Sequence, residues 1–210
     1  MGNGASLRHT PLHLLIGEDC MAVNGISAIF PDTEWRPTHY VKVDDSAFDS
    51  LTWQEQVEPM LYARCLLWSK FDVGSLPNVT YVERCKRHHA YMADNYQKRV
   101  QSWHLPELCT AINSLSLMAQ WAVLLGYDEI YLLGCDLNFT DGHDDHFVED
   151  YYPTVDSGYQ ERSNTNALYA HELIKRCCPV PVYNATLGGE LEVYPRVDLR
   201  KVLNGEMASA

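Results

Sequence analysis

The stretch GYDEIYLLGCD at residues 126–136 decides the fold. From Pro106 onward, apolar residues recur at spacings of three and four, which predicts a buried helix that ends before Gly126. The chain then enters a continuous apolar run that closes on Gly134 and the carboxylate of Asp136. Such a run predicts a buried strand over 129–136 whose carboxyl end carries a polar group.

The flanking segments extend this pattern in both directions. Apolar and β-branched runs predict strands at 20–23, 39–43 and 78–84, with a turn-rich loop at 30–38, and helical spacing predicts a helix over 52–68. A second late helix is expected from about Ser163, taken as its N-cap, and extended structure resumes at 180–183, where Pro181 suits an edge strand. Strands that alternate with helices, without hairpin signals, predict an α/β fold with a mostly parallel sheet.

Polar residues follow three of the expected strands. Asn24, Asp44 and Asp136 stand at their carboxyl ends. Ligands of parallel sheets gather at that edge, because loop N–H groups and helix N-termini converge there. One pocket is therefore expected to collect these side chains.

Composition narrows the function. The 210 residues suit one domain, and 28 acidic against 16 basic residues give a net charge of −12, which disfavours binding to nucleic acid. The seven cysteines form no C-x-x-C pair, which favours a reducing, cytoplasmic location. The sequence contains no run of about 20 apolar residues, so no membrane span is predicted.

Two further groups carry potential chemistry. The loop 136–147 crowds carboxylates, Asn138, His143 and His146 into a short stretch, which could bind a divalent cation or place a general base, or could form an ordinary polar turn. Asn113 and Ser114 near the start of one helix could donate to a ligand, or could be packing residues. Glu161 stands at the start of the next helix, where it could simply cap it.

The opening MGNGASL has two interpretations. Gly2 with the small residue Ser6 at the sixth position fits the pattern for N-myristoylation, in which Gly2 is acylated after Met1 is removed. The stretch Gly2-Asn3-Gly4 also suits a turn whose backbone N–H groups bind a phosphate.

Several blocks together carry a resemblance: 2–7, 23–25, 40–44, Ser114, 126–136 and the tail 183–198. They resemble the 6-hydroxymethylpterin diphosphokinase-like family of bacteria and phages, a module shared with motility-associated-factor flagellin glycosyltransferases. They are also similar to bacterial sialyltransferases that use CMP-sialic acid.

The resemblance implies a single Rossmann-like nucleotide-binding domain over 1–210, with 50–105 as an inserted or less typical segment. It implies that the Gly2–Gly4 turn and Asn24 approach the phosphate and ribose, while Ser114 and Gly134 approach the base and sugar. This favours the turn over acylation. Family members carry a hydrophobic strand before the glycine turn, where Met1 stands here, so either the chain is truncated or mis-started, or the sheet lacks that central first strand.

We therefore expect a glycosyltransferase that moves a sugar, most simply a CMP-linked nonulosonic acid, from its nucleotide to a hydroxyl acceptor, without a metal cofactor. His146 or Glu161 is the expected base. The expected nucleotide contacts are Gly2, Asn3, Gly4, Ser6, Asn24, Asp44, Asn113, Ser114, Gly134 and Asp136.

Two alternatives remain open at this point. In the first, Mg²⁺ held by Asp44, Asp45, Asp136 and Asp144 supports transfer of diphosphate from ATP to a hydroxymethylpterin. In the second, the chain is a non-catalytic nucleotide-binding remnant. The sequence leaves the oligomeric state undetermined.

Overall fold

A computed structural model describes residues 1–43, 57–68, 73–84, 107–108, 113–138, 145–148 and 159–206. In chain order the elements are η1 (Ala5–His9), η2 (Leu12–Leu15), β1 (Met21–Val23), η3 (Ile26–Asp32), β2 (His39–Lys42), η5 (Glu58–Leu61), β3 (Arg64–Trp68), β4 (Val79–Arg84), β5 (Glu107–Leu108), α2 (Ser114–Leu124), β6 (Ile130–Leu132), α3 (Tyr159–Cys177), β7 (Val182–Asn184) and α4 (Leu199–Leu203), where η marks a 3₁₀ helix.

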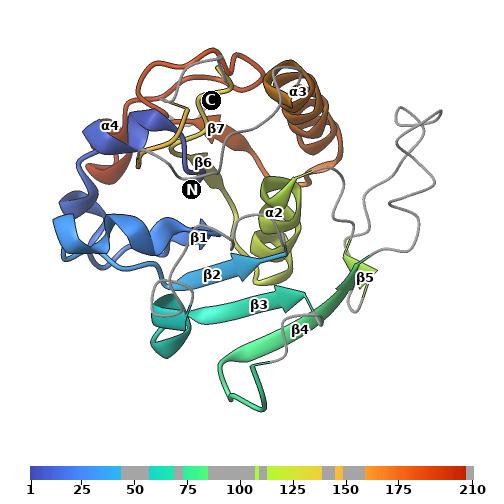
Figure 1. The fold of residues 1–210 in the computed structure, drawn as a ribbon. Helices are drawn as coiled ribbons and strands as arrows, with labels where there is room; N and C mark the ends of the chain where they lie inside the picture. Colours follow the sequence, from blue (N-terminus) through green and yellow to red (C-terminus); the bar gives the residue numbers. More distant parts are fainter. Residues whose placement is uncertain are drawn as a thin grey trace.

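The strands form two parallel sheets. The first has the order β1-β2-β3-β4-β5, and the second pairs β6 with β7 (Figure 1). Every pair in both sheets is parallel, with Ala22 opposite Tyr40 and Tyr131 opposite Tyr183 as examples of the register. The predicted α/β class with a parallel sheet is confirmed.

Successive residues of β2 and β3 point to opposite faces, and both faces are buried. Val41 and Leu66 pack with Leu117 and Met118 of α2. Tyr40, Cys65 and Leu67 pack on the other face, against a cluster built by the 3₁₀ segments and Trp35. A strand buried on both faces reads as a continuous apolar run, which explains why period-2 alternation is missing from the sequence.

Helix α2 touches both sheets. Its Leu117 and Trp121 belong to the cluster over the first sheet, whereas Ala119 packs with Leu132, Ile174 and Val182 of the second sheet and α3. One helix therefore contributes to the cores of both sheets.

Two helix predictions need correction. Residues 64–68, expected as the end of a helix, form β3, because a short buried apolar run has the same pattern in either structure. Helix α2 begins at Ser114 and not at Pro106; Asn113 caps it by accepting from the Ser116 N–H at 3.1 Å, and 107–108 pair with β4 instead. The remainder of the predicted 52–68 helix lies partly outside the described residues.

The other elements agree more closely with expectation. β1, β2, β4 and β7 lie within two residues of the predicted strands, and the strand expected over 129–136 is confirmed in its centre, at 130–132. The loop expected at 30–38 begins as the last turn of η3. Helix α3 begins at Tyr159, so Ser163 lies inside it and is not its N-cap.

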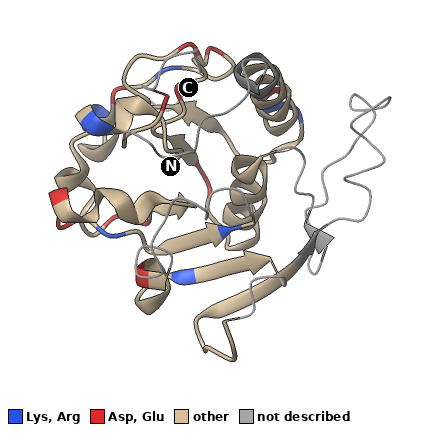
Figure 2. Cartoon of the chain, in the orientation of Figure 1, with Lys and Arg blue, Asp and Glu red and all other residues tan. Residues whose placement is uncertain are grey.

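Charge is spread thinly over the described elements. Figure 2 shows the described Lys and Arg residues on several separate elements, including the pairs Lys175–Arg176 on α3 and Arg200–Lys201 on α4. Across the described ranges, we find no helix with the length and apolar character needed to cross a bilayer.

Candidate functional site

The first four residues lie between β1 and β6. The Gly2 N–H donates to the Leu133 carbonyl at 2.8 Å, and the Gly4 N–H donates to the Gly134 carbonyl at 2.9 Å. On the other side, the Asn3 side-chain amide donates to the Val23 carbonyl at 3.0 Å. The glycine turn is thus fixed against the carboxyl ends of both strands.

These bonds correct the expected role of the glycines. The Gly2 and Gly4 N–H groups are used within the protein, so they do not form the phosphate cradle that the sequence suggested. Glycine is required here for contact: a Cβ on Gly4 would lie 2.6 Å from the Asp136 carboxyl carbon, and one on Gly134 would lie 2.6 Å from the Gly2 carbonyl oxygen. Two backbones this close leave no room for side chains.

Asp136 holds the turn that follows the glycines. Its carboxylate accepts from the Ser6 N–H at 2.7 Å and also from the Ser6 hydroxyl, and the residue is only 6% exposed. Hydrogen bonds to a buried carboxylate are stronger than neutral ones. Asp136 is therefore a structural link between the amino terminus and the end of β6.

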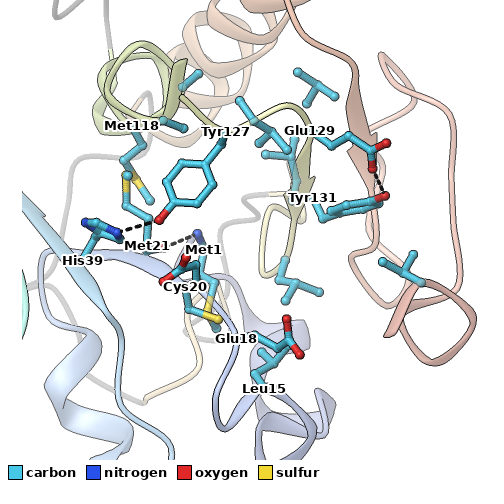
Figure 3. Close-up of a pocket in the computed structure, with 18 of the residues that line it drawn as sticks. Met1, Leu15, Glu18, Cys20, Met21, His39, Met118, Tyr127, Glu129 and Tyr131 are labelled. Atoms are coloured by element: carbon cyan, nitrogen blue, oxygen red, sulfur yellow. Dashed lines mark hydrogen bonds between the residues drawn. The ribbon is translucent and has the colours of Figure 1, made fainter. Parts of the chain in front are cut away.

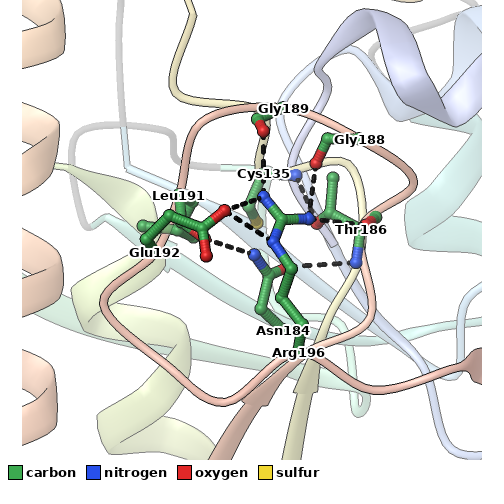
Figure 4. Close-up of polar contacts among 8 residues, drawn as sticks. All are labelled: Cys135, Asn184, Thr186, Gly188, Gly189, Leu191, Glu192 and Arg196. Atoms are coloured by element: carbon green, nitrogen blue, oxygen red, sulfur yellow. Dashed lines mark hydrogen bonds and ion pairs between the residues drawn. The ribbon is translucent and has the colours of Figure 1, made fainter.

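The loop after β7 supports Asp136 from behind. The Glu190 N–H donates to the Asp136 carbonyl at 2.6 Å, and Gly189 is so close that a Cβ would meet the same carbonyl oxygen at 2.6 Å. Figure 4 shows the Arg196 guanidinium inside this loop, donating to the Gly188 and Gly189 carbonyls at 2.7 and 2.9 Å. The loop is thus held in one conformation against the strand end.

A pocket of about 130 Å³ opens at this edge. Residues of the glycine turn, of the segment after β6, of the start of α2, of 145–146 and of α3 line it. Its polar lining consists of Asn3, Asn113, Asp136, Asn138, Asp145, His146 and His171. Among the described lining residues there is no lysine or arginine.

His146 is placed in the pocket by contacts with the amino terminus. It forms an antiparallel bridge with Gly4, and its carbonyl accepts from the Arg8 guanidinium at 2.9 Å. The next residue, Phe147, donates its N–H to the Asn3 carbonyl at 3.1 Å. Burial lowers the pKa of His146 to about 4, so the ring is neutral near pH 7.

His171 on α3 is the functional candidate that sequence reasoning missed. It is 4% exposed, and burial lowers its pKa to about 4. The Tyr194 hydroxyl donates its only proton to the His171 carbonyl at 2.9 Å, so at 3.2 Å the His171 Nδ1 must be the donor to the Tyr194 oxygen. Its Nε2 is then an acceptor. The signal was available: a histidine on the buried face of a helix, between Ala170 and Ile174.

The predicted residues separate into those that meet at the pocket and those that do not. Gly2, Asn3, Gly4, Asn113, Gly134, Asp136 and His146 line it. Ser6 contacts it only through Asp136, and Ser114 begins α2 beside Asn113 without lining it. Asn24 adjoins Val23 in a left-handed conformation (φ 52°) with its carbonyl bound by the Tyr40 hydroxyl at 2.7 Å, and it too lies outside the lining.

The remaining predicted residues receive no placement. Asp44, Asp45 and Asp144 lie outside the described residues, and Glu161 lies in the first turn of α3 with its side chain outside them as well. Within the described ranges, no three His, Cys, Asp or Glu side chains are arranged to hold a metal ion.

Comparison of the chain with family models, with curated proteins and with solved structures found no match.

Proposed function

We propose that the chain is a glycosyltransferase whose pocket binds the sugar-bearing part of a nucleotide-sugar donor, within a Rossmann-like arrangement. One observation carries the proposal: the glycine turn, the carboxyl end of β6, the start of α2 and two histidines converge on one pocket. Parallel sheets bind nucleotides at this edge, next to the point where the strand order reverses.

The lining chemistry favours a hydroxyl-rich ligand. The Asn138 amide can donate and accept, as sugar hydroxyls require, and Asn113, whose oxygen caps α2, carries an amide NH₂ that can donate, whereas the described lining offers no cation for a bare phosphate. The volume of about 130 Å³ is below the roughly 300–1,000 Å³ of ligand pockets for drug-sized molecules. The described walls therefore account for one part of a nucleotide sugar.

The proposed transfer needs a proton acceptor. The acceptor hydroxyl oxygen forms a bond to the anomeric carbon as the bond from that carbon to the phosphate oxygen breaks, and the nucleoside monophosphate leaves with the electron pair. The hydroxyl proton passes to a neutral imidazole. His146 and the Nε2 of His171 are the candidates, because both rings are neutral near pH 7 and both line the pocket.

Asp136 and Asp145 line the same pocket, which keeps Mg²⁺-dependent diphosphate transfer as the alternative. A thermal-shift series with CMP, CDP, UDP, GDP and ATP, each in EDTA and in Mg²⁺, separates the two, because a ligand that binds only the folded state raises the melting temperature. We expect CMP to act in EDTA. A response to ATP that requires Mg²⁺ would overturn the proposal in favour of the alternative.

Turnover is tested separately with CMP-linked nonulosonic acids and hydroxyl acceptors. We expect release of CMP from the wild type, and a loss of at least about 100-fold in His146→Ala or His171→Gln, the range that general bases contribute. CMP binding without release in the wild type would identify a non-catalytic nucleotide-binding protein.

A further inference from the structure

Several hydrogen-bonding groups of the pocket are already used within the protein. The Asp136 carboxylate accepts from Ser6, and the Asn3 side-chain NH₂ donates to a carbonyl at the end of β1. The Asn113 side-chain oxygen accepts from the first turn of α2. A ligand therefore has to bind the groups that these internal bonds leave available.

The Nε2 atom of His171 is one such group. The Nδ1–H of this ring donates to the Tyr194 oxygen at 3.2 Å, and the Tyr194 hydroxyl donates to the His171 carbonyl at 2.9 Å. The two rings also pack edge to face, with their centroids 5.6 Å apart. These contacts fix both the orientation and the tautomer of the imidazole, so Nε2 carries a lone pair and acts as an acceptor.

This acceptor atom is accessible from the pocket. His171 lines the pocket, and within the part of the chain that the structure describes its Nε2 has no hydrogen-bond partner. The atom is nevertheless not fully buried, so the small exposed part of the ring includes Nε2. A polar atom in this position is satisfied by a ligand donor or by water.

Asn113 supplies a group of the opposite polarity. Because its oxygen caps α2, its NH₂ is the half of the amide that remains for a ligand, and this NH₂ has no partner among the described residues and is not fully buried. Asn113 and His171 stand on helices that pack together, α2 and α3, and both line the same pocket of about 130 Å³. The pocket therefore presents one fixed acceptor and one fixed donor.

Two neighbouring hydroxyls match this pair of groups. A hydroxyl both donates and accepts, so one can donate to the His171 Nε2 while its neighbour accepts from the Asn113 NH₂. An ionised carboxylate has no proton to donate to Nε2, and an apolar group satisfies neither atom. The pair therefore favours a vicinal diol.

We propose that His171 Nε2 and the Asn113 NH₂ bind the 2′- and 3′-hydroxyls of a ribose, and that Tyr194 is the positioning residue that holds His171 in the accepting tautomer. The choice of a ribose rests on the proposed function, in which the ligand is a nucleotide. The requirement for a diol rests on the pocket alone. Because the donor substrate then engages Nε2, His146 is left as the proton acceptor of the proposed transfer.

Binding of CMP and of 2′,3′-dideoxy-CMP to the full chain tests the proposal. We expect CMP to bind roughly 10- to 100-fold more tightly, because the dideoxy nucleotide leaves both groups without a partner. Ribose 5-phosphate and tetrahydrofurfuryl phosphate, which has the same ring without hydroxyls, repeat the comparison without the base. Calorimetry or NMR titration gives the dissociation constants.

Substitutions at the two binding residues locate the diol. His171→Asn carries an amide only at the position of Nδ1, so it can still bond Tyr194, and it should reduce the preference for CMP by roughly 10-fold. His171→Gln carries an amide near the position of Nε2 and should retain part of the preference. Asn113→Ser keeps a cap for α2 but lacks the NH₂, and it should also reduce the preference.

Tyr194→Phe tests the positioning role, with Tyr127→Phe as its matched control. Figure 3 shows Tyr127 and His39 pointing toward each other with the Tyr127 oxygen 2.9 Å from Nε2, a second edge-to-face pair that lines a separate, mainly apolar cavity. Long-range proton–nitrogen NMR should show His171 protonated only at Nδ1 in the wild type and in Tyr127→Phe. In Tyr194→Phe we expect a mixture of tautomers and a weaker preference for CMP.

The possible outcomes separate this inference from the proposed function. Equal binding of CMP and its dideoxy analogue, or an undiminished preference in His171→Asn, would overturn the diol site and leave the nucleotide proposal standing. A preference for ribose 5-phosphate without turnover of any nucleotide sugar would support the diol site and remove the proposed transfer. Protonation of His171 at Nε2 in the wild type, or an unchanged tautomer in Tyr194→Phe, would overturn the role of Tyr194. Binding of neither CMP nor ribose 5-phosphate would overturn both proposals.

Discussion

The pocket at the carboxyl edge and a slot lined by residues of β1, β6 and α2 adjoin at the amino terminus, yet they differ in chemistry. Gly2, Asn3 and Gly4 line the pocket, which encloses about 130 Å³ among glycine backbones, amides and two histidines. Met1 lines the slot, which encloses about 310 Å³, mainly among apolar side chains of α2, β6 and α4. Where backbones meet without side chains, the surface is polar; where apolar side chains meet, it is apolar. The first surface suits a small polar ligand.

The largest effect is expected from a substitution at Gly189, which packs against the backbone of the pocket residue Asp136. Gly188 and Gly189 both have φ near 70°, but only at Gly189 does a Cβ meet the Asp136 backbone, whereas Gly188 faces open space. Left-handed strain alone costs about 1–2 kcal/mol for alanine, and overpacking adds about 1–3 kcal/mol. Urea unfolding should therefore show a loss of about 3–4 kcal/mol in Gly189→Ala and about 1–2 kcal/mol in Gly188→Ala. Equal losses would contradict the close contact.

The next effect removes the link between Asp136 and Ser6. Asp136→Ala leaves the Ser6 N–H and hydroxyl without their acceptor, and hydrogen bonds to charged groups are each worth about 1.5–3 kcal/mol. We expect a loss of about 3 kcal/mol of unfolding free energy in Asp136→Ala and about 1.5 kcal/mol in Ser6→Ala, which removes the hydroxyl alone. If Ser6→Ala were as damaging as Asp136→Ala, the backbone bond to the carboxylate would be unimportant.

Measuring the unfolding free energy at a series of pH values tests the pocket separately from the slot, because His146 and His171 both line the pocket. The folded pKa of His171 is lowered to about 4, whereas an unfolded histidine titrates near 6.5. Its stabilising contribution is therefore complete above pH 6.5 and is lost as the pH falls toward 4, by about 1.4 kcal/mol per pH unit. Between pH 6.5 and 4, the unfolding free energy of the wild type should fall more steeply than that of His171→Gln, by about 1.4 kcal/mol per pH unit. Parallel curves for the two proteins would mean that His171 titrates normally in the fold.

The smallest effect is expected from a substitution that fills part of the slot. Ala122 of α2 lines it, and Ala122→Leu adds apolar atoms to an empty apolar space. At about 0.8 kcal/mol per buried methylene, reduced by imperfect fit, we expect urea unfolding to show a gain of about 1 kcal/mol in Ala122→Leu. A loss of unfolding free energy would show that the slot has no spare volume.

Sequence predicted the class of fold well and its detailed contacts poorly. The 126–136 block, the strands before Asn24 and Asp44, and the carboxyl-edge placement of Asp136 could be read from apolar runs and the polar residues that end them. The strand at 64–68 could not, because its buried run lacks alternation. The sequence suggested that the Gly2 and Gly4 N–H groups bind a phosphate, but in the structure they donate to Leu133 and Gly134. A glycine needed for close backbone contact and one needed to bind an anion look alike in sequence. The helical pattern could place His171 on a buried face, but only the fold shows that this face of α3 lines the pocket.

The most direct measurement of the central claim is an NMR titration of the isotope-labelled chain with CMP in EDTA. We predict saturable amide shifts at Asn3, Gly4, Gly134 and His171, which surround the pocket, and none at Met21 or Tyr131, which face the slot. Shifts confined to the slot residues, or no shifts at millimolar CMP, would contradict a nucleotide site at the carboxyl edge.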